Sequence, residues 1–270
     1  MLSMPQHTTG DGMEAISEYF WKQEDDIPAE LGYPLFGTEH LMSIAITLIA
    51  VGAVIAIFKR LDGKRRVRFL KLIPVAMVFL ELFKDLFLVS VHRFGIGYLP
   101  LHVCSIGIFV FLLREYLPWK RAKEVFGEIA YVLIMPASIA ALIFADWTEL
   151  YPVWNFINLH SYVWHGALVL YPLLLLINGD ILPSIRHIHW SVLFLLIVVP
   201  PIYIFDKLTG CNYFFVNRPV EGSPLEWWAF VLGNPGYLVG YALMVLVVLV
   251  IVYLVTGLVL NRPNGPRGRG

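Results

Sequence analysis

Charged residues are scarce in this sequence, and long polar stretches are largely missing. Only 15% of the 270 residues are charged and 58% are hydrophobic, giving a mean hydropathy of +0.71. These values lie well beyond those of soluble domains, so the composition argues against a water-soluble protein. The lysines and arginines lie in a few short blocks between apolar runs, which argues against nucleic acid as a partner.

Cysteine is almost absent, and the sequence also lacks the features of a cleaved signal peptide. Cys104 and Cys211 are the only two cysteines; they are too few for a disulfide scaffold and are not at the spacing of a zinc site. We expect neither a metal nor another cofactor. The first thirty residues carry seven acids against one base and contain no apolar run, so no cleaved signal peptide is expected.

Seven apolar stretches are long enough to cross a membrane, which takes about 20 residues of helix. They lie near residues 37–58, 71–92, 99–117, 126–145, 157–177, 188–205 and 236–260. The sequence therefore predicts an all-α fold, a polytopic transmembrane bundle of about seven helices.

The distribution of lysine and arginine predicts the orientation of this bundle. In the seven-span arrangement, fifteen of these residues fall on one side of the alternating loops and four on the other. Because short cytoplasmic loops carry the excess of positive charge, we expect an N-terminus outside and a C-terminus in the cytoplasm. The predicted organisation is an acidic extracytoplasmic segment (1–35), a transmembrane domain (36–260) and a disordered basic tail (261–270), in a multi-pass protein of the cell membrane.

Several ionisable side chains lie inside the predicted spans, where each costs several kcal/mol unless it meets a partner or water. On the predicted topology they gather at similar depth in four helices: His40, His102, Cys104, His160 and His165 in outer halves, Glu81, Lys84 and Asp85 near mid-membrane, and His92 near an outer end. Such a cluster is the default candidate for a functional site.

Each member also has a purely structural explanation. Glu81, Lys84 and Asp85 are spaced i, i+3 and i+4, so they can neutralise one another on one helix face. His40 and His92 lie close to helix ends, and we favour interfacial side chains that reach water.

The remaining members of the cluster are equally ambiguous. His102 and Ser105 share a helix face, whereas Cys104 points elsewhere. A lone cysteine in a span is more often a packed hydrophobe than a nucleophile, and an oxidising exterior could join Cys104 to Cys211. His160 and His165 lie about 140° apart around a helix, so at most one is expected to face a given partner squarely.

Five sequence motifs occur in the order found in a known family. They are FGTEHL at 36–41, the Glu81 and Lys84 pair, YLPLHVCSI at 98–106, HGALVLYP at 165–172 and NYFFVNRP at 212–219. Together they resemble the YwaF-like family of bacterial integral membrane proteins over most of the chain from about residue 34. That family is similar to eukaryotic transmembrane acyltransferases that remodel phospholipid acyl chains with a membrane cysteine, and more distantly to membrane lipid-ester hydrolases that use Thr and His.

The resemblance implies lipid acyl transfer or lipid-ester hydrolysis on the extracytoplasmic side. Cys104 would be the nucleophile and His165 its base, because a buried thiol needs an adjacent base to lose its proton. His102 or Ser105 would donate to the oxyanion, and Glu81, Lys84 and Asp85, with His40 and His160, would support the site. The expected partner is a membrane lipid.

Two other functions fit the same residues. A proton- or cation-coupled transporter or channel would use the Glu/Lys/Asp trio and the histidines as a relay, but it offers no role for Cys104. A sensor or assembly protein would use the outer loop at 206–235 as its contact surface.

Overall fold

The computed structural model describes residue 16 and residues 18–260, and this part of the chain contains helices and no strand. The longer helices are α2 (Thr38–Arg60), α3 (Gly63–Ser90), α4 (Val103–Tyr116), α5 (Lys120–Ile129), α6 (Met135–Ile143), α7 (Phe156–Asn178), α8 (Ile188–Thr209), α9 (Pro224–Leu232) and α10 (Tyr237–Leu260). A π-helical stretch, Ala130–Ile134, joins α5 to α6 without a break. Short 3-10 turns lie at Glu24–Asp26, Ala29–Leu31, Ile96–Tyr98, Ile185–His187 and Tyr213–Phe215. The predicted all-α fold is confirmed.

Every predicted span corresponds to a helix, and five helical segments of the described chain are both long and apolar enough to cross a membrane. These are Thr38–Arg60, Lys120–Ile143, Phe156–Asn178, Ile185–Thr209 and Tyr237–Leu260. The other two predicted spans are α3 and α4. Helix α3 is long but carries basic residues at its start and the Glu81–Asp85 trio near its end. Helix α4 has 14 residues, about 21 Å of helix against a hydrocarbon core of about 30 Å.

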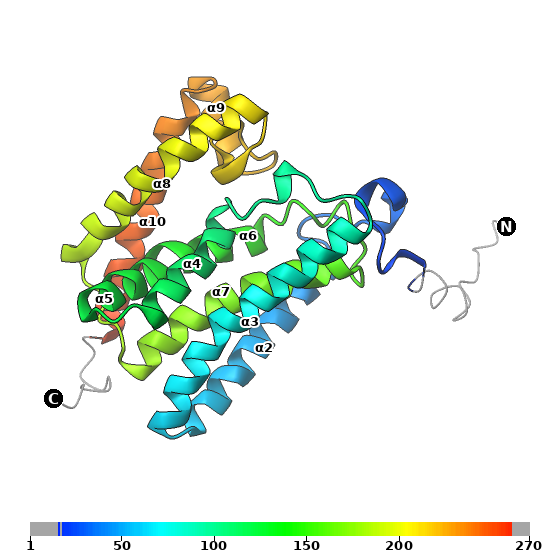
Figure 1. Ribbon diagram of the computed structural model, residues 1–270. Coiled ribbons are helices and arrows are strands. Elements are labelled where there is room, and N and C mark those ends of the chain that lie inside the picture. The colour runs from blue at the N-terminus through cyan, green and yellow to red at the C-terminus, as the bar shows by residue number, and fades with distance from the viewer. Residues whose placement is uncertain (1–15, 17, 261–270) are drawn as a thin grey trace.

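Helix α7 lies at the centre of the bundle and packs against α2, α3 and α6. Helices α4 and α5 form a tightly packed antiparallel hairpin beside it, and α8 and α10 both lie on the far side of α4 and α6 (Figure 1). Small residues allow the close helix crossings. A Cβ on Gly107 of α4 would come within 2.8 Å of Leu168 in α7, and one on Gly166 of α7 within 3.0 Å of Thr47 in α2.

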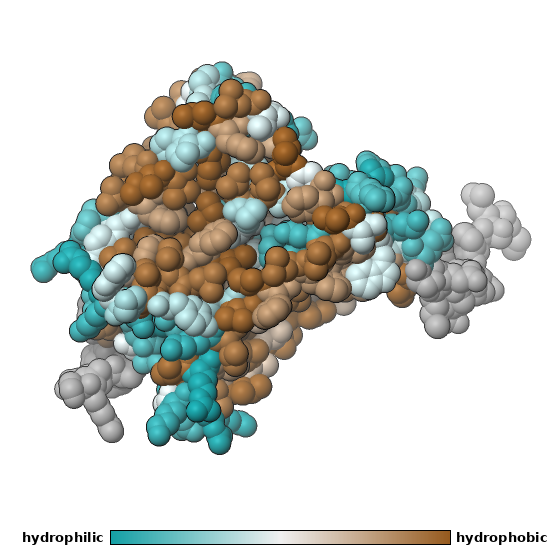
Figure 2. All heavy atoms as spheres, in the orientation of Figure 1, coloured by the Kyte–Doolittle hydropathy of each residue, from teal (hydrophilic) through white to brown (hydrophobic). Residues whose placement is uncertain are grey.

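The outer faces of the helices are strongly apolar. Figure 2 shows hydrophobic side chains over the middle of the visible face and hydrophilic ones gathered toward the ends of the helices. Leucine, valine, isoleucine and phenylalanine side chains are exposed along α2, α3, α8 and α10. Water would not tolerate such a continuous apolar surface, whereas hydrocarbon does.

The described part of the predicted N-terminal segment folds against the loop between α6 and α7. The Asn155 side-chain amide donates to the carbonyls of Tyr19 and Lys22 at 2.8 and 3.0 Å, and the Tyr33 N–H donates to the Thr148 carbonyl at 2.9 Å. Arg93, which precedes α4, pairs with Asp25 at 2.5 Å and with Asp26 at 3.3 Å. Residues 1–15 and 17 of that segment, and the predicted tail 261–270, lie outside the described residues.

Candidate functional site

The predicted charged trio lies on the buried side of α3. The Lys84 ammonium is 2.7 Å from Glu81 Oε1 and 3.4 Å from Asp85 Oδ1. Only 13% of the Lys84 side chain and 9% of the Glu81 side chain are exposed. Two carboxylates and one ammonium thus neutralise much of one another's charge, as the i, i+3 and i+4 spacing predicts. The trio also presents Glu81 to the neighbouring helix α7.

His160 of α7 is the residue that meets Glu81. Its Nε2 atom lies 4.0 Å from Glu81 Oε2, and this nitrogen is buried with no hydrogen-bond partner among the described residues. The imidazole stacks on Trp164, one turn further along α7, with ring centroids 5.5 Å apart. His160 therefore links the charged trio to α7.

His165 is held in one tautomer by its own helix. Its Nδ1 atom lies 2.8 Å from the Ser161 carbonyl oxygen, and because a carbonyl can only accept, Nδ1 carries the proton. The ring stacks almost parallel on Trp147, with an interplanar angle of 6° and centroids 5.2 Å apart. The lone pair therefore lies on Nε2. The hydrogen bond to Ser161 and the stacking on Trp147 together fix the orientation of the ring.

Cys104 lies in the first turn of α4, as its second residue, two positions after His102, the residue that precedes the helix. The first backbone hydrogen bond of the helix runs from the Ile106 N–H to the His102 carbonyl, and His102 makes no side-chain cap. The N–H groups of residues 103–105 therefore have no intrahelical acceptor. This end of a helix favours negative charge, both on a thiol and on an oxygen placed near it.

The packing of α4 on α7 brings Cys104 level with His165. Gly107 lies against Leu168, and one turn further on the Phe111 ring packs at a tilt on Tyr171, with centroids 4.1 Å apart. One turn earlier, the same register places Cys104 opposite residues 164 and 165 of α7. Both helices run in the same direction, because α4 and α7 are separated by one antiparallel segment.

The cluster lies where α3, α4 and α7 meet. Helix α7 packs against both α3 and α4, His160 faces Glu81 across the first of these contacts, and the register of α4 on α7 places the start of α4 level with His165. The structure thus places Glu81, Lys84, His102, Cys104, His160 and His165 on the three segments around this junction, with Ser105 in the same first turn as Cys104.

His40 does not join this cluster, and its interpretation as an interfacial side chain reaching water is wrong. The ring is fully buried; its Nδ1 accepts from the Phe36 N–H at 2.9 Å, and its Nε2 donates to the Leu142 carbonyl at 2.9 Å. Both nitrogens are used to fix the start of α2 to the end of α6. His92, in contrast, is exposed, as the interfacial interpretation predicts.

A polar cavity of about 710 Å³ opens above the start of α4. His102 lies in its wall, and its charged lining residues are Asp146, Glu149, Arg218 and Glu221. No salt bridge joins any of these four to another described residue. Cys211 also lines this cavity, and both cysteines are free thiols in the structure.

Comparison with known proteins places this arrangement in a family. A family model described as the TMEM164 family, a transmembrane family, matches residues 35–253. The chain belongs to the TMEM164 family. With the apolar outer surface, this establishes an integral membrane protein. No curated protein and no solved structure matches the chain.

The match to the TMEM164 family includes every residue of the cluster between α3, α4 and α7. The Glu81, Lys84, His102, Cys104, His160 and His165 side chains all fall within residues 35–253. Among the described residues of this TMEM164-family chain, no group of three His, Cys, Asp or Glu side chains is arranged to hold a metal ion.

Within the predicted outer loop, a short segment at residues 213–215 contacts His102, and the sequence does not reveal this contact. The Tyr213 and Phe215 rings lie 4.7 and 5.6 Å from the His102 ring, and Phe214 and Phe215 adopt the left-handed conformation with φ of 52° and 55°. Non-glycine residues in this conformation are strained and are often found at ligand sites. The adjacent pair of phenylalanines in NYFFVNRP was the available signal, but nothing in the sequence reveals the backbone conformation.

This TMEM164-family chain also has a second buried ionic network, at the opposite end of α4. Arg114 lies 2.5 Å from Glu115 and 3.4 Å from Asp180, and the Tyr171 hydroxyl donates to Glu115 at 2.6 Å. The sequence places Arg114 with the cytoplasmic basic residues, whereas its side chain is only 10% exposed. The adjacent acid, Glu115, was the signal for a buried pair. The network ties α4 to α7 and to the loop that follows α7.

Proposed function

We propose that this protein is a membrane-embedded lipid acyltransferase or lipid-ester hydrolase in which Cys104 is the nucleophile and His165 the base. The observation that carries the proposal is the register of α4 on α7, which sets the Cys104 thiol level with an imidazole whose proton is held on Nδ1. The free Nε2 lone pair is what a general base needs. The resemblance to cysteine-dependent acyltransferases supports the same pair.

The first half of the reaction forms a thioester. His165 Nε2 takes the thiol proton, and the Cys104 sulfur attacks the ester carbonyl carbon of a lipid. A carbon–sulfur bond forms, and the bond between that carbon and the lipid alcohol oxygen breaks. His165 returns the proton to the departing alkoxide, which leaves as the alcohol of a lyso-lipid.

The second half transfers the acyl group to an acceptor. A hydroxyl of a second lipid, or water in a hydrolase, gives its proton to His165 and attacks the thioester carbonyl. The carbon–sulfur bond breaks, and the proton returns to sulfur. In both halves the developing oxyanion is stabilised by donors at the start of α4, where residues 103–105 have free N–H groups and His102 and Ser105 are adjacent.

The buried charges complete the proposed site. Glu81, paired with Lys84, contacts His160 and so ties α3 to α7, the helix that carries His165 on another face. The register sets Cys104 opposite residues 164 and 165 of α7, whereas α7 begins at Phe156, so the first turn of α4 lies about 12 Å below the start of α7. On this basis we place Cys104 within the hydrocarbon layer. We propose that the seven predicted spans cross the cell membrane with this site toward the outside, the N-terminal segment over it and the basic tail in the cytoplasm.

The test measures acyl turnover by the purified full chain in liposomes that contain a phospholipid labelled in one acyl chain. Cys104→Ser is expected to abolish turnover, and His165→Ala to lower it by about 10²- to 10⁴-fold. Cys211→Ser is the control for the loss of a thiol; because Cys211 lines the polar cavity but takes no part in the bond-making steps, it should lower turnover far less than Cys104→Ser does. A hydroxylamine-sensitive acyl group on Cys104 should accumulate in His165→Ala if the second half is slowed more than the first.

Wild-type turnover in Cys104→Ser would overturn the proposal. In that case, a Glu81→Gln variant that loses pH-dependent ion flux in the same liposomes would favour the carrier or channel that the charged trio also allows.

A further inference from the structure

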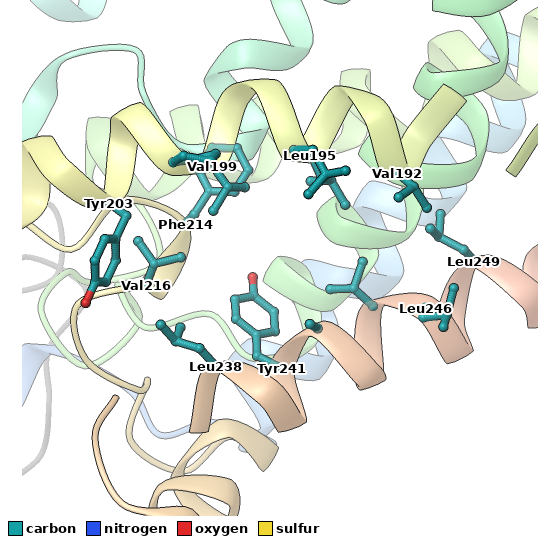
Figure 3. Close-up of a pocket in the computed structure, with 14 residues that line it drawn as sticks. Val192, Leu195, Val199, Tyr203, Phe214, Val216, Leu238, Tyr241, Leu246 and Leu249 are labelled. Atoms are coloured by element: carbon teal, nitrogen blue, oxygen red, sulfur yellow. The ribbon is translucent and has the colours of Figure 1, made fainter. Parts of the chain in front are cut away.

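Helices α8 and α10 enclose an apolar groove that the proposed chemistry does not use. Its volume is about 570 Å³. Figure 3 shows the two helices on opposite sides of the space, with Leu195 and Val199 on α8 facing Leu246 and Tyr241 on α10. Apart from the hydroxyls of Tyr203 and Tyr241, the side chains that line it are hydrocarbon. Such a lining accepts an apolar ligand and no charged one.

The length of the groove matches the depth of one leaflet. Tyr203 lines one end and Val192 the other, and these residues are eleven positions apart on α8, which is about 17 Å of helix. Half of a hydrocarbon core of about 30 Å is about 15 Å. A chain that enters at the Tyr203 end can therefore run to the middle of the membrane.

The groove is also open to the surrounding lipid. Helices α8 and α10 are two of the candidate spans, and only 11% and 17% of their most apolar windows are buried inside the protein. A volume of about 570 Å³ spread over about 17 Å leaves a groove too narrow for another helix to insert between α8 and α10, because a helix with side chains is about 10–12 Å across. Its width suits a single hydrocarbon chain.

One short loop forms a common wall between this groove and the polar cavity above α4. Phe214 and Val216 line the groove, whereas Tyr213 and Phe215 line the polar cavity and contact His102. Residues 213–216 thus line the two compartments alternately. Two hydrogen bonds hold this loop in place: the Tyr237 hydroxyl donates to the Phe215 carbonyl at 2.7 Å, and the Arg218 N–H donates to the Asn212 side chain at 2.9 Å. An apolar and a charged compartment thus meet within four residues, next to the proposed site.

We propose that the α8–α10 groove is the binding site for one acyl chain of a membrane lipid whose polar head lies in the cavity lined by His102 and Arg218. The proposal rests on the proposed function only for the fate of the lipid, since binding in the groove needs no turnover. In this arrangement the lipid passes over the edge of the loop at residues 213–216 with its ester group at that edge, and the groove selects the chain that is presented to Cys104. The depth of the groove then determines which acyl-chain lengths bind.

The first experiment measures binding without chemistry. Full-length Cys104→Ser protein in liposomes is irradiated with a phosphatidylcholine that carries a photoactivatable group in the middle of one acyl chain, and the labelled peptides are mapped. We expect labelling on the facing sides of α8 and α10. Ala242→Trp, which fills the middle of the groove, should reduce this labelling at least tenfold, as should Val199→Trp from the opposite wall.

Val247→Trp is the matched control. Val247 is on the same helix as Ala242 but does not line the groove, and 48% of it is exposed, so the same bulk placed there should leave the labelling unchanged. Melting temperatures of the variants show whether each is folded. Labelling that is spread over the outer faces of the helices, or that the two folded groove variants do not reduce, would identify surrounding lipid only and overturn the inference.

The second experiment separates this inference from the proposed function. In protein with Cys104 intact, Ala242→Trp should lower turnover of long-chain lipids at least tenfold and spare short-chain ones, whereas loss of the nucleophile removes both. Groove labelling in a wild-type protein without acyl turnover would refute the proposed function and leave the groove as a lipid site. Turnover whose chain-length preference is the same in wild type and Ala242→Trp would refute the groove.

Discussion

His165 and His40 are both buried histidines in helices, yet only His165 keeps a nitrogen free. His165 donates through Nδ1 to the Ser161 carbonyl and leaves Nε2 unbound, whereas both nitrogens of His40 are occupied by backbone groups of Phe36 and Leu142. A ring with both nitrogens occupied cannot exchange a proton without breaking a hydrogen bond. The hydrogen-bond partners, more than depth in the membrane, therefore distinguish a candidate base from a structural histidine.

Replacement of His40 should destabilise the protein without acting on the chemistry. His40→Leu leaves the buried Leu142 carbonyl and the part-buried Phe36 N–H without their partner, and an unsatisfied buried group costs about 1–3 kcal/mol. We expect a clearly lower melting temperature in detergent. Turnover per folded molecule should stay near the wild-type value. His92→Leu, at an exposed histidine, is the control and should melt as wild type does. A wild-type melting temperature in His40→Leu would contradict this structural role.

At the scale of the elements, the short helix α4 positions the candidate nucleophile against α7. It is short, it carries Cys104 in its first turn, and Gly107 allows it to approach α7 and the π-helical stretch at once. A Cβ at Gly107 would lie 2.8 Å from a Leu168 methyl and 2.9 Å from an Ile134 methyl. This contact fixes the level of Cys104 against α7.

A larger side chain at Gly107 should therefore separate α4 from α7. Gly107→Val is expected to cost about 1–3 kcal/mol of stability through overpacking, and to lower acyl turnover more than the loss of folded protein explains, because the Cys104 to His165 register is disturbed. Gly52→Val in α2 is the matched control, since a Cβ there has no neighbour within 4 Å. Melting temperature and turnover are measured together for both. Equal behaviour of the two variants would mean that this contact does not set the site.

The elements also show what the sequence can and cannot predict. Hydropathy located seven helices, because the cost of burying backbone polar groups in hydrocarbon acts along the chain; most ends agree within four residues, but α3 begins eight residues and α5 six residues before the predicted start. The charged trio was recognisable from its spacing alone. The sequence did not reveal that α4 begins only at Val103, that α9 forms a helix in the outer loop, or that His40 bonds to Leu142, 102 residues away. The start of α4 and the His40 bond depend on packing between segments that are distant in sequence, whereas α9 begins at a local signal, the Ser223 cap followed by Pro224.

At the scale of the whole molecule, the two ends of the bundle differ in their polar chemistry. One end has the polar cavity, the N-terminal segment and the candidate site; the other has the Arg114, Glu115 and Asp180 network and the basic turn between α2 and α3. Positive charge in short loops is retained on the cytoplasmic side. The same asymmetry that orients the chain would therefore place the candidate site toward the outside.

Labelling of single cysteines can test this orientation. In a Cys104→Ser, Cys211→Ser background, Glu30→Cys should react with a membrane-impermeant maleimide in intact cells, and Lys64→Cys should react only after the membrane is opened. Both positions are exposed in the structure, so a difference in labelling reports the side of the membrane and not burial. The reverse pattern would place the polar cavity and Cys104 toward the cytoplasm, and the lipid acted on would then belong to the inner leaflet. Labelling of both positions in intact cells would mean that the number of spans between residues 30 and 64 is even.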